Sequence, residues 1–124
     1  MLVVSNNPLM KGGENVEFVE GSFRDVLVNV RDKVFLGYDL VSHPLFASSR
    51  MMFSPFRTVI LGKRHHSSDL EQCQVAENAI ILFEKATEHR NEQPEHDMDY
   101  AAMDLRLHES ALQEISILVD AHAI

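Results

Sequence analysis

Short apolar runs alternate with a helix-like segment through the first half of the chain. Four runs have the length and composition of strands: Leu2–Ser5, Val16–Glu20, Tyr38–His43 and Thr58–Leu61. Between the second and third runs, apolar residues recur at helical spacing from Phe23 to Leu36. A helix that joins two such strands is typical of a parallel βαβ unit. The pattern therefore predicts an α/β domain with about four strands in a mainly parallel sheet and flanking helices.

Polar residues at the starts of the expected helices predict where those helices begin. Asn7 precedes a proline and is a good cap for one helical turn. Ser22, with an acidic residue three positions later, is a weaker capping box for the helix that follows. Ser68 and Glu71 form the full capping box of a longer helix.

The second half contains two longer helical patterns, separated by a polar break at residues 88–96. One face of the first carries five apolar residues: Leu70, Cys73, Ala76, Ile80 and Phe83. The last has an apolar stripe at near-heptad spacing: Met98, Ala101, Leu105, Leu112, Ile115 and Val119. These stripes predict two long C-terminal helices packed together. A homodimer seam would show the same stripe, but core packing is favoured because any core-facing helix has this spacing over three turns.

Length and composition are those of one domain. The chain has 124 residues, 45% of them hydrophobic and 24% charged, so we expect a single domain spanning residues 1–124. Cys73 is the only cysteine, which excludes an intrachain disulfide and favours a reducing, cytoplasmic compartment. No basic leader opens the chain, and no apolar run approaches the roughly 18 residues of a membrane span. We therefore expect neither export nor a membrane partner.

Charge is concentrated in the second half of the chain. Residues 1–62 carry six Lys or Arg and six Asp or Glu, whereas residues 63–124 carry five and thirteen, so the net charge of -8 belongs to the second half. Phosphate binding needs a basic face, and an acidic half would repel a nucleic-acid backbone. The composition therefore excludes nucleic acid as an expected partner.

Polar side chains follow two of the predicted strands at the points where those strands end. Asn6 and Asn7 follow the first run, and Ser42 and His43 follow the third. Parallel strands bring such ends to one edge of a sheet, together with the free amides of the helices that follow. This edge favours a small anionic ligand such as a phosphate or carboxylate, and Arg24, Arg50 and Arg57 lie near enough in sequence to supply charge. Although capping is the commoner use of most of these residue types, the ligand-binding candidates are Asn6, Asn7, Ser22, Ser42, His43 and Arg50.

No complete catalytic set accompanies this edge. His43 is the only candidate that titrates near neutral pH, so it is the natural general acid or base. Ser42 precedes it directly, but adjacent side chains of a strand point to opposite faces, which argues against a Ser42–His43 pair. A Gly-rich phosphate loop is also missing. The sequence therefore favours a protein that is not an enzyme and names no catalytic residue.

Histidine and cysteine spacings give little support for a metal or a cofactor. His65 and His66 are adjacent, and Asp104 and His108 lie four positions apart, but neither pair has further ligands at a recognisable spacing. We therefore expect these histidines to be solvated surface residues. Cys73 lies on an apolar helix face and is expected to be a small buried residue. No metal or cofactor is predicted.

An apolar loop connects the third and fourth runs. Residues 44–56 form a longer loop than a compact domain usually has, and they include several Phe and Met residues. Such a loop fits either a cover that closes over a ligand or a contact surface for another protein. The candidate partner-contact residues are Met51, Met52 and Phe53.

Several segments resemble the GrdX-like family, in matching order along nearly the whole chain. They are Ser5-Asn6-Asn7-Pro8-Leu9, Phe18-Val19-Glu20-Gly21-Ser22, Val26-Leu27, Val30-Arg31-Asp32, Ser42-His43-Pro44-Leu45, Asp104-Leu105-Arg106-Leu107 and Glu109-Ser110-Ala111-Leu112. The family comprises small proteins of anaerobic bacteria, encoded beside the glycine, sarcosine and betaine reductase genes. Its usual loop after His-Pro-Leu differs from the apolar stretch at residues 46–55, so the chain resembles a divergent member. The resemblance implies a helper role beside a reductase component, without an established reaction.

Two functional hypotheses follow from these observations. The first is a non-catalytic accessory protein that docks onto a reductase component or another enzyme through the apolar loop and an acidic helical face. The second is a site for a small anionic metabolite or phosphate, binding or enzymatic, at the strand ends. We favour the first slightly, because no acid, base and nucleophile can be assembled from the sequence.

Overall fold

The computed structural model describes residues 1–90 and 92–122, with the side chains of the last helix described to residue 118. Its four strands are β1 (Leu2–Ser5), β2 (Val16–Phe18), β3 (Tyr38–Leu40) and β4 (Thr58–Arg64). Its three α-helices are α1 (Phe23–Phe35), α2 (Leu70–Ala86) and α3 (Asp97–His122). Three short 3-10 turns are η1 (Pro8–Met10), η2 (Arg50–Phe53) and η3 (Pro94–His96). The expected α/β class is confirmed and each of the four expected strands is present, although β2 and β3 end earlier than expected, at Phe18 and Leu40, and β4 continues to Arg64.

The sheet is mixed, with strand order β2-β1-β4-β3. β1 and β2 run parallel, whereas β4 lies between β1 and β3 and is antiparallel to both. The expectation of a mainly parallel sheet was therefore wrong. The connection from β3 to β4 contains no crossover helix, so the chain returns in the opposite direction, as antiparallel connections allow. The C-terminal ends of β1 and β3 still emerge at one edge, where β4 begins between them.

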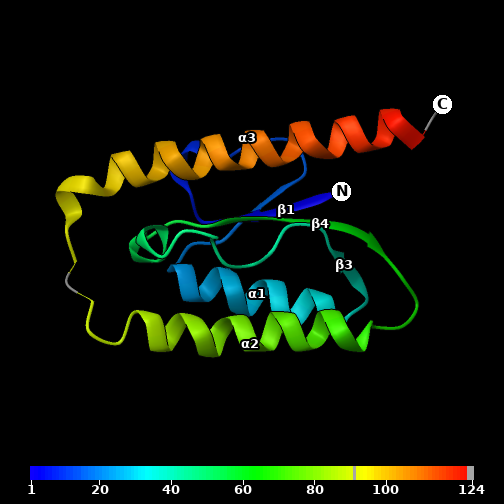
Figure 1. Ribbon diagram of the computed structural model, residues 1–124, viewed down its shortest axis with the longest axis horizontal. Coiled ribbons are helices and arrows are strands. Elements are labelled where there is room, and N and C mark those ends of the chain that lie inside the picture. The colour runs from blue at the N-terminus through cyan, green and yellow to red at the C-terminus, as the bar shows by residue number, and fades with distance from the viewer. Residues whose placement is uncertain (91, 123–124) are drawn as a thin grey trace.

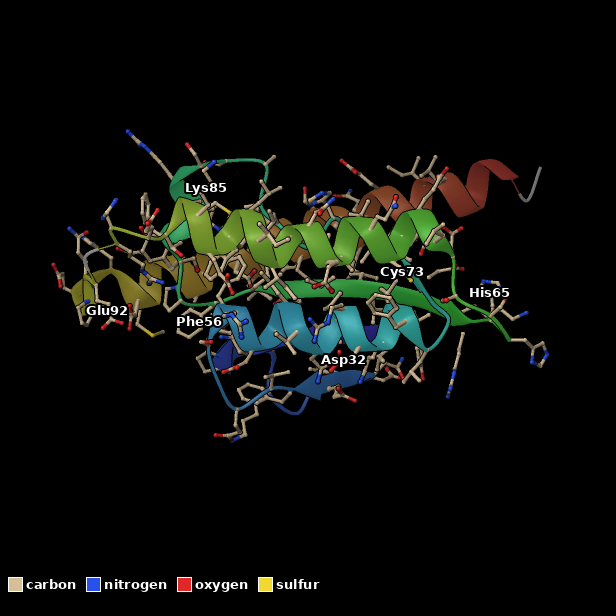
Figure 2. All side chains as sticks on the ribbon, turned by 90° about the horizontal axis from the view of Figure 1, so that it is seen from below. Asp32, Phe56, His65, Cys73, Lys85 and Glu92 are labelled. Atoms are coloured by element: carbon tan, nitrogen blue, oxygen red, sulfur yellow. The ribbon has the colours of Figure 1, made fainter. Side chains whose placement is uncertain are left out.

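The three helices form two layers on opposite faces of the sheet (Figure 1). α1 and α2 lie side by side below the sheet, and α3 runs along the other face (Figures 1 and 2). The expectation that the two long C-terminal helices pack together was therefore wrong, because the sheet separates them. Their apolar stripes are each satisfied by a different partner: α2 packs on α1, and α3 packs on η1 and β4.

The main core lies between the sheet and the α1–α2 layer. Two buried clusters fill it, one around Val4, Val26, Val59 and Cys73, and the other around Phe23. Strand alternation explains the first, because Val59 faces this layer while its neighbours Thr58 and Ile60 face α3. On the α3 side, Ala101 is the only fully buried apolar side chain that the described part of α3 contributes. Met98 of the expected stripe is exposed, and Val119 lies outside the described side chains.

Local capping signals were largely correct. Asn7 caps η1, and Ser22 caps α1 with a reciprocal capping box in which Asp25 accepts from the Ser22 backbone. That hydrogen bond lowers the pKa of Asp25 below its ordinary value. The cap of α2 is Asp69, so the expectation of Ser68 was wrong by one residue. Leu70, which was expected on the apolar face of this helix, is its first residue and lies outside the core, at 74% exposed.

The loop at residues 44–56 is partly ordered by η2. Met52 is buried in the cluster around Phe23, and Phe46 packs edge-on against Phe23. None of the helices that the structure describes has the length and apolar character to cross a membrane.

Candidate functional site

A buried carboxylate joins α3 to the edge of the sheet. Asp104 is fully buried, and its Oδ2 accepts hydrogen bonds from Thr58 Oγ1 at 2.6 Å and Asn7 Nδ2 at 2.9 Å. Its Oδ1 accepts from the Thr58 backbone N–H at 3.1 Å. A buried carboxylate is tolerated only when its lone pairs are satisfied, and here both oxygens have donors. Asp104 therefore anchors α3 at the start of β4.

Asn7 completes this anchor from the end of β1. It is fully buried, its Nδ2 also donates to the Ala101 carbonyl at 2.9 Å, and its Oδ1 caps η1 through the Leu9 N–H. Its backbone N–H donates to Ser5 Oγ, which lies 2.7 Å from Thr58 Oγ1. Every polar group of the Asn7 side chain is therefore engaged within the protein.

Asn6 links three segments at the same edge. Its Nδ2 donates to the carbonyls of Gly21 and Pro55 at 3.0 and 2.8 Å, and its Oδ1 accepts from the Arg57 N–H at 2.8 Å. The side chain thus holds the α1 entry and the loop before β4 against the end of β1. Its amide has the bonding of a structural cross-link.

Arg57 is a buried cation beside Asp104. Nε donates to the Pro44 carbonyl at 2.7 Å, and Nη2 donates to the carbonyls of His43 at 2.6 Å and Leu45 at 3.5 Å. The guanidinium carbon lies 4.2 Å from the centre of the Phe46 ring. Burial lowers the pKa of Arg57 to about 10, opposed by the Asp104 charge, so the guanidinium stays protonated at neutral pH.

A pocket of about 420 Å³ opens between α3, the residues after β3 and the start of β4. We refer to it as the α3 pocket. Its polar lining residues are Ser42, His43, Arg57, Thr58 and His108. Its apolar lining residues are Leu45, Phe46, Ala47, Ile60, Leu107 and Ala111. The structure therefore places two sequence candidates, Ser42 and His43, in one cavity.

Ser42 and His43 lie beyond the end of β3, not within it. The objection that neighbouring strand residues face opposite sides does not apply to them, and both line the α3 pocket. Ser42 Oγ accepts from the Ile60 N–H at 2.8 Å. His43 Nδ1 accepts from the Leu45 N–H at 3.0 Å, so the proton of the neutral ring is on Nε2.

His108 is the polar lining residue that the sequence analysis assigned to the solvated surface, and this was wrong. It is 7% exposed, and its Nδ1 is buried without a hydrogen-bond partner among the described residues. Burial lowers the pKa of His108, while Asp104 and Glu109 oppose the shift and Arg57 adds to it. The neutral ring is therefore favoured. A signal was present, because Ala101, Asp104 and His108 share one helical face at spacings of three and four.

The GrdX-like protein family model matches residues 2–113. The chain belongs to this family. All residues that line the α3 pocket of this GrdX-like protein fall within the matched span. No curated protein and no solved structure matches the chain.

The remaining ligand candidates of the GrdX-like protein lie outside the α3 pocket. Ser22 lines a separate hollow beside α1 with Arg24 and Arg90. Arg50 lines another, with Met51 and Tyr100. Asn6 and Asn7 do not line the pocket, and their amides are bonded to protein groups. The strand-end edge is therefore divided into a pocket and a structural network.

Other chemistry-bearing groups are remote from the pocket or isolated. Among the described residues, no three His, Cys, Asp or Glu side chains are grouped so that they could hold a metal ion. His65 pairs with Asp39 at 2.7 Å, at the end of the molecule opposite Phe56 (Figure 2). Cys73 of α2 is buried in the core between the sheet and the α1–α2 layer, as expected from its position on the apolar face of the helix.

Proposed function

We propose that this GrdX-like protein binds a small molecule in the α3 pocket and acts as a non-catalytic accessory protein. The supporting observation is His108, a buried ring whose Nδ1 has no partner among the described residues, set in a cavity with mostly apolar walls. Small-molecule sites are commonly concave, apolar and supplied with a few converging polar groups, in volumes of roughly 300–1,000 Å³. The α3 pocket fits that description.

The bonding of the polar groups favours binding over turnover. Asp104 and Thr58 are committed to the anchor of α3, and Ser42 Oγ accepts from a backbone amide. A nucleophile needs a hydrogen-bonded base oriented by a third group. His43 uses Nδ1 for a backbone amide, so it is not oriented by an acidic side chain. We therefore name no catalytic residue.

Filling the pocket tests this function directly. Ala111→Leu adds a larger side chain to the pocket wall on α3, and Ala102→Leu makes the same change on the exposed face of that helix. Isovalerate, isovaleramide, benzoate and benzamide serve as probes in NMR titrations of all three proteins. We expect at least one probe to bind the unaltered protein and Ala102→Leu but not Ala111→Leu. No binding to the unaltered protein, or equal binding to both variants, would overturn the proposal.

Docking to a partner enzyme is the second candidate function. Met52 is buried and fixes η2 to the core, while Phe53 on the same turn is 43% exposed. An exposed aromatic side chain on an anchored turn fits an interaction site, since such side chains carry much of the energy of protein interfaces. The family membership makes a reductase component the partner to test first.

Two variants of η2 separate docking from stability. Phe53→Glu changes the exposed ring, whereas Met52→Ala removes a buried side chain and serves as the stability control. With purified glycine reductase components, we expect Phe53→Glu to weaken complex formation while its melting temperature stays unchanged. Binding that is unaffected by Phe53→Glu would exclude η2 as the docking surface.

A further inference from the structure

The polar groups of the α3 pocket offer more hydrogen-bond donors than acceptors. Arg57 has five N–H groups, of which Nε and Nη2 make the three hydrogen bonds to the carbonyls of residues 43–45. Nη1 makes no hydrogen bond to any described residue, and it lies 3.9 Å from Asp104 Oδ1. Two charged N–H donors of a pocket-lining residue are therefore unused.

Ser42 and His43 add two further donors. Because Ser42 Oγ accepts from the Ile60 N–H, its own hydroxyl hydrogen remains available. Because His43 Nδ1 accepts from the Leu45 N–H, its Nε2–H remains available. Both residues line the same cavity as Arg57.

Most acceptors near the pocket are already occupied; the exception is the neutral His108 ring, which offers one acceptor nitrogen and whose Nδ1 has no partner among the described residues. Both oxygens of Asp104 accept from Thr58 and Asn7, and the carbonyls of His43, Pro44 and Leu45 accept from Arg57. The open donors of Arg57, Ser42 and His43 outnumber this one acceptor nitrogen, so a bound molecule has to supply mainly acceptors. A ligand without them would leave the Arg57 donors unpaired, which costs about 1–3 kcal/mol for each buried group, whereas the exposed His43 ring can donate to water instead.

The local charge favours one negative charge over two. Arg57 is the cation that lines the pocket, and Asp104 compensates part of its charge from the protein side. A phosphate dianion would find only one unused guanidinium nitrogen, Arg57 Nη1, on a cation whose charge Asp104 already partly compensates. The helix N-terminus capped by Ser22, which would suit a phosphate, lines a different hollow.

The walls of the pocket define the rest of the ligand. Leu45, Phe46 and Ile60 line the cavity from the loop and β4, and Leu107 and Ala111 line it from α3. These side chains cannot satisfy polar groups. An apolar body of a few carbon atoms matches them.

We infer that the α3 pocket takes a small monocarboxylate with an apolar body, whose carboxylate accepts hydrogen bonds from Arg57 Nη1, Ser42 and His43; this rests on the proposed ligand-binding function. The apolar body lies along Leu45, Phe46 and Leu107. We therefore expect selectivity for charge and shape together. Acetate has the charge but lacks the apolar body, and an amide such as isovaleramide has the apolar body but lacks the charge.

Matched probes test the ligand class. Isovalerate and isovaleramide have nearly the same shape, as do benzoate and benzamide, so each pair isolates the carboxylate. We expect each acid to bind at least about tenfold more tightly than its amide, since charge-assisted hydrogen bonds are roughly twice as strong as neutral ones. Acetate and inorganic phosphate are expected to bind more weakly than isovalerate.

A pair of variants at position 43 assigns the interaction to the pocket. His43→Asn and His43→Asp both keep a side-chain oxygen that can accept from the Leu45 N–H, as these residues do in Asx turns. Only Asn keeps a donor, whereas Asp adds a negative charge. We expect His43→Asn to retain isovalerate binding within a few-fold and His43→Asp to lose at least tenfold, with melting temperatures confirming that both fold.

The outcomes distinguish this inference from the function on which it rests. If acids and amides bind equally well and Ala111→Leu blocks both, the carboxylate class is wrong while ligand binding stands. If no probe binds the unaltered protein, both are wrong. If acids bind but His43→Asp binds them as well as His43→Asn, the carboxylate does not lie at this end of the pocket and the inference is overturned.

Discussion

Asp104 of α3 and Thr58 of β4 are joined by two hydrogen bonds, one from the backbone N–H at 3.1 Å and one from the hydroxyl at 2.6 Å. With Asn7 as third donor, this buried carboxylate adds a polar contact to the apolar packing of α3 on the sheet. The described part of α3 contributes only Ala101 as a fully buried apolar side chain. The attachment of α3 therefore relies in part on this buried polar contact.

Asp104→Ala tests that dependence. The change leaves the Thr58 N–H and one of the two Asn7 amide hydrogens buried without an acceptor, and removing one member of such a network typically costs about 3 kcal/mol. We expect urea denaturation to show a lower free energy of unfolding and hydrogen exchange to rise selectively in α3. Glu114→Ala, on the exposed face of the same helix, is the control. A loss no larger than that of the control would contradict the anchoring role.

The lowered pKa of His108 makes the stability of the folded state pH-dependent. Burial disfavours the charged ring, opposed by Asp104 and Glu109 and assisted by Arg57, so the folded protein binds a proton less readily than the unfolded chain does. Stability from neutral His108 is complete above the unfolded pKa of about 6.5 and is lost as the pH falls toward the lower folded pKa. The folded state should therefore weaken over this acidic window.

His108→Gln isolates this contribution, since glutamine does not titrate. Free energies of unfolding measured between pH 5 and pH 8 should fall more steeply toward acid in the unaltered protein than in the variant. Other titrating groups are common to both proteins and cancel in the difference. Parallel profiles would show that His108 titrates alike in the folded and unfolded states.

Gly37 and Gly12 form a matched pair for backbone strain. Both have positive φ, +107° at Gly37 and +81° at Gly12, which L side chains rarely adopt. A Cβ at Gly37 would also clash with the His65 carbonyl, whereas a Cβ at Gly12 would meet open space. We expect Gly12→Ala to cost about 1 kcal/mol from conformation alone and Gly37→Ala to cost distinctly more. Thermal denaturation of the two variants would settle the order.

The start of α2 provides a test between neighbouring caps. Asp69 accepts from the Gln72 N–H at 3.1 Å, so Asp69→Ala should destabilise the protein by about 1 kcal/mol. Ser68→Ala removes the side chain that the capping-box pattern favoured, and it should change the melting temperature little. The opposite ranking would show that the helix begins one residue earlier in solution.

Local signals were enough to predict the strands and the α-helices, because each depends on neighbouring residues, but not η2 and η3, which lie in the segments expected to be a loop and a polar break. The capping box of Ser22 and Asp25 and the apolar spacing of Val26 and Val30 gave α1, and Asn7 gave the start of η1. The direction of β4 could not be predicted in this way. It is decided by pairings such as Ser5 with Thr58, across more than fifty residues.

The α3 pocket was predicted in part. Ser42 and His43 were found because they follow a strand, whereas Arg57, which precedes one, was recognised only as a possible source of charge and was not on the list of ligand-binding residues. Asp104 and His108 lie on a face that also holds apolar residues, and an ordinary amphipathic pattern does not reveal which polar residues of such a face are buried. Their burial follows from the position of α3 on the sheet face opposite α2, which the apolar stripes alone did not give.

Cys73, the single thiol of the chain, can be used to measure motion within the α1–α2 layer. Cys73 is 3% exposed, with Sγ 4.0 Å from the Val34 carbonyl of α1. A thiol-modifying reagent can reach it only when α2 separates from α1, so the rate of modification under native conditions measures how often these helices part. Because α3 lies on the other face, a change in that rate on adding a pocket ligand would reveal coupling across the sheet.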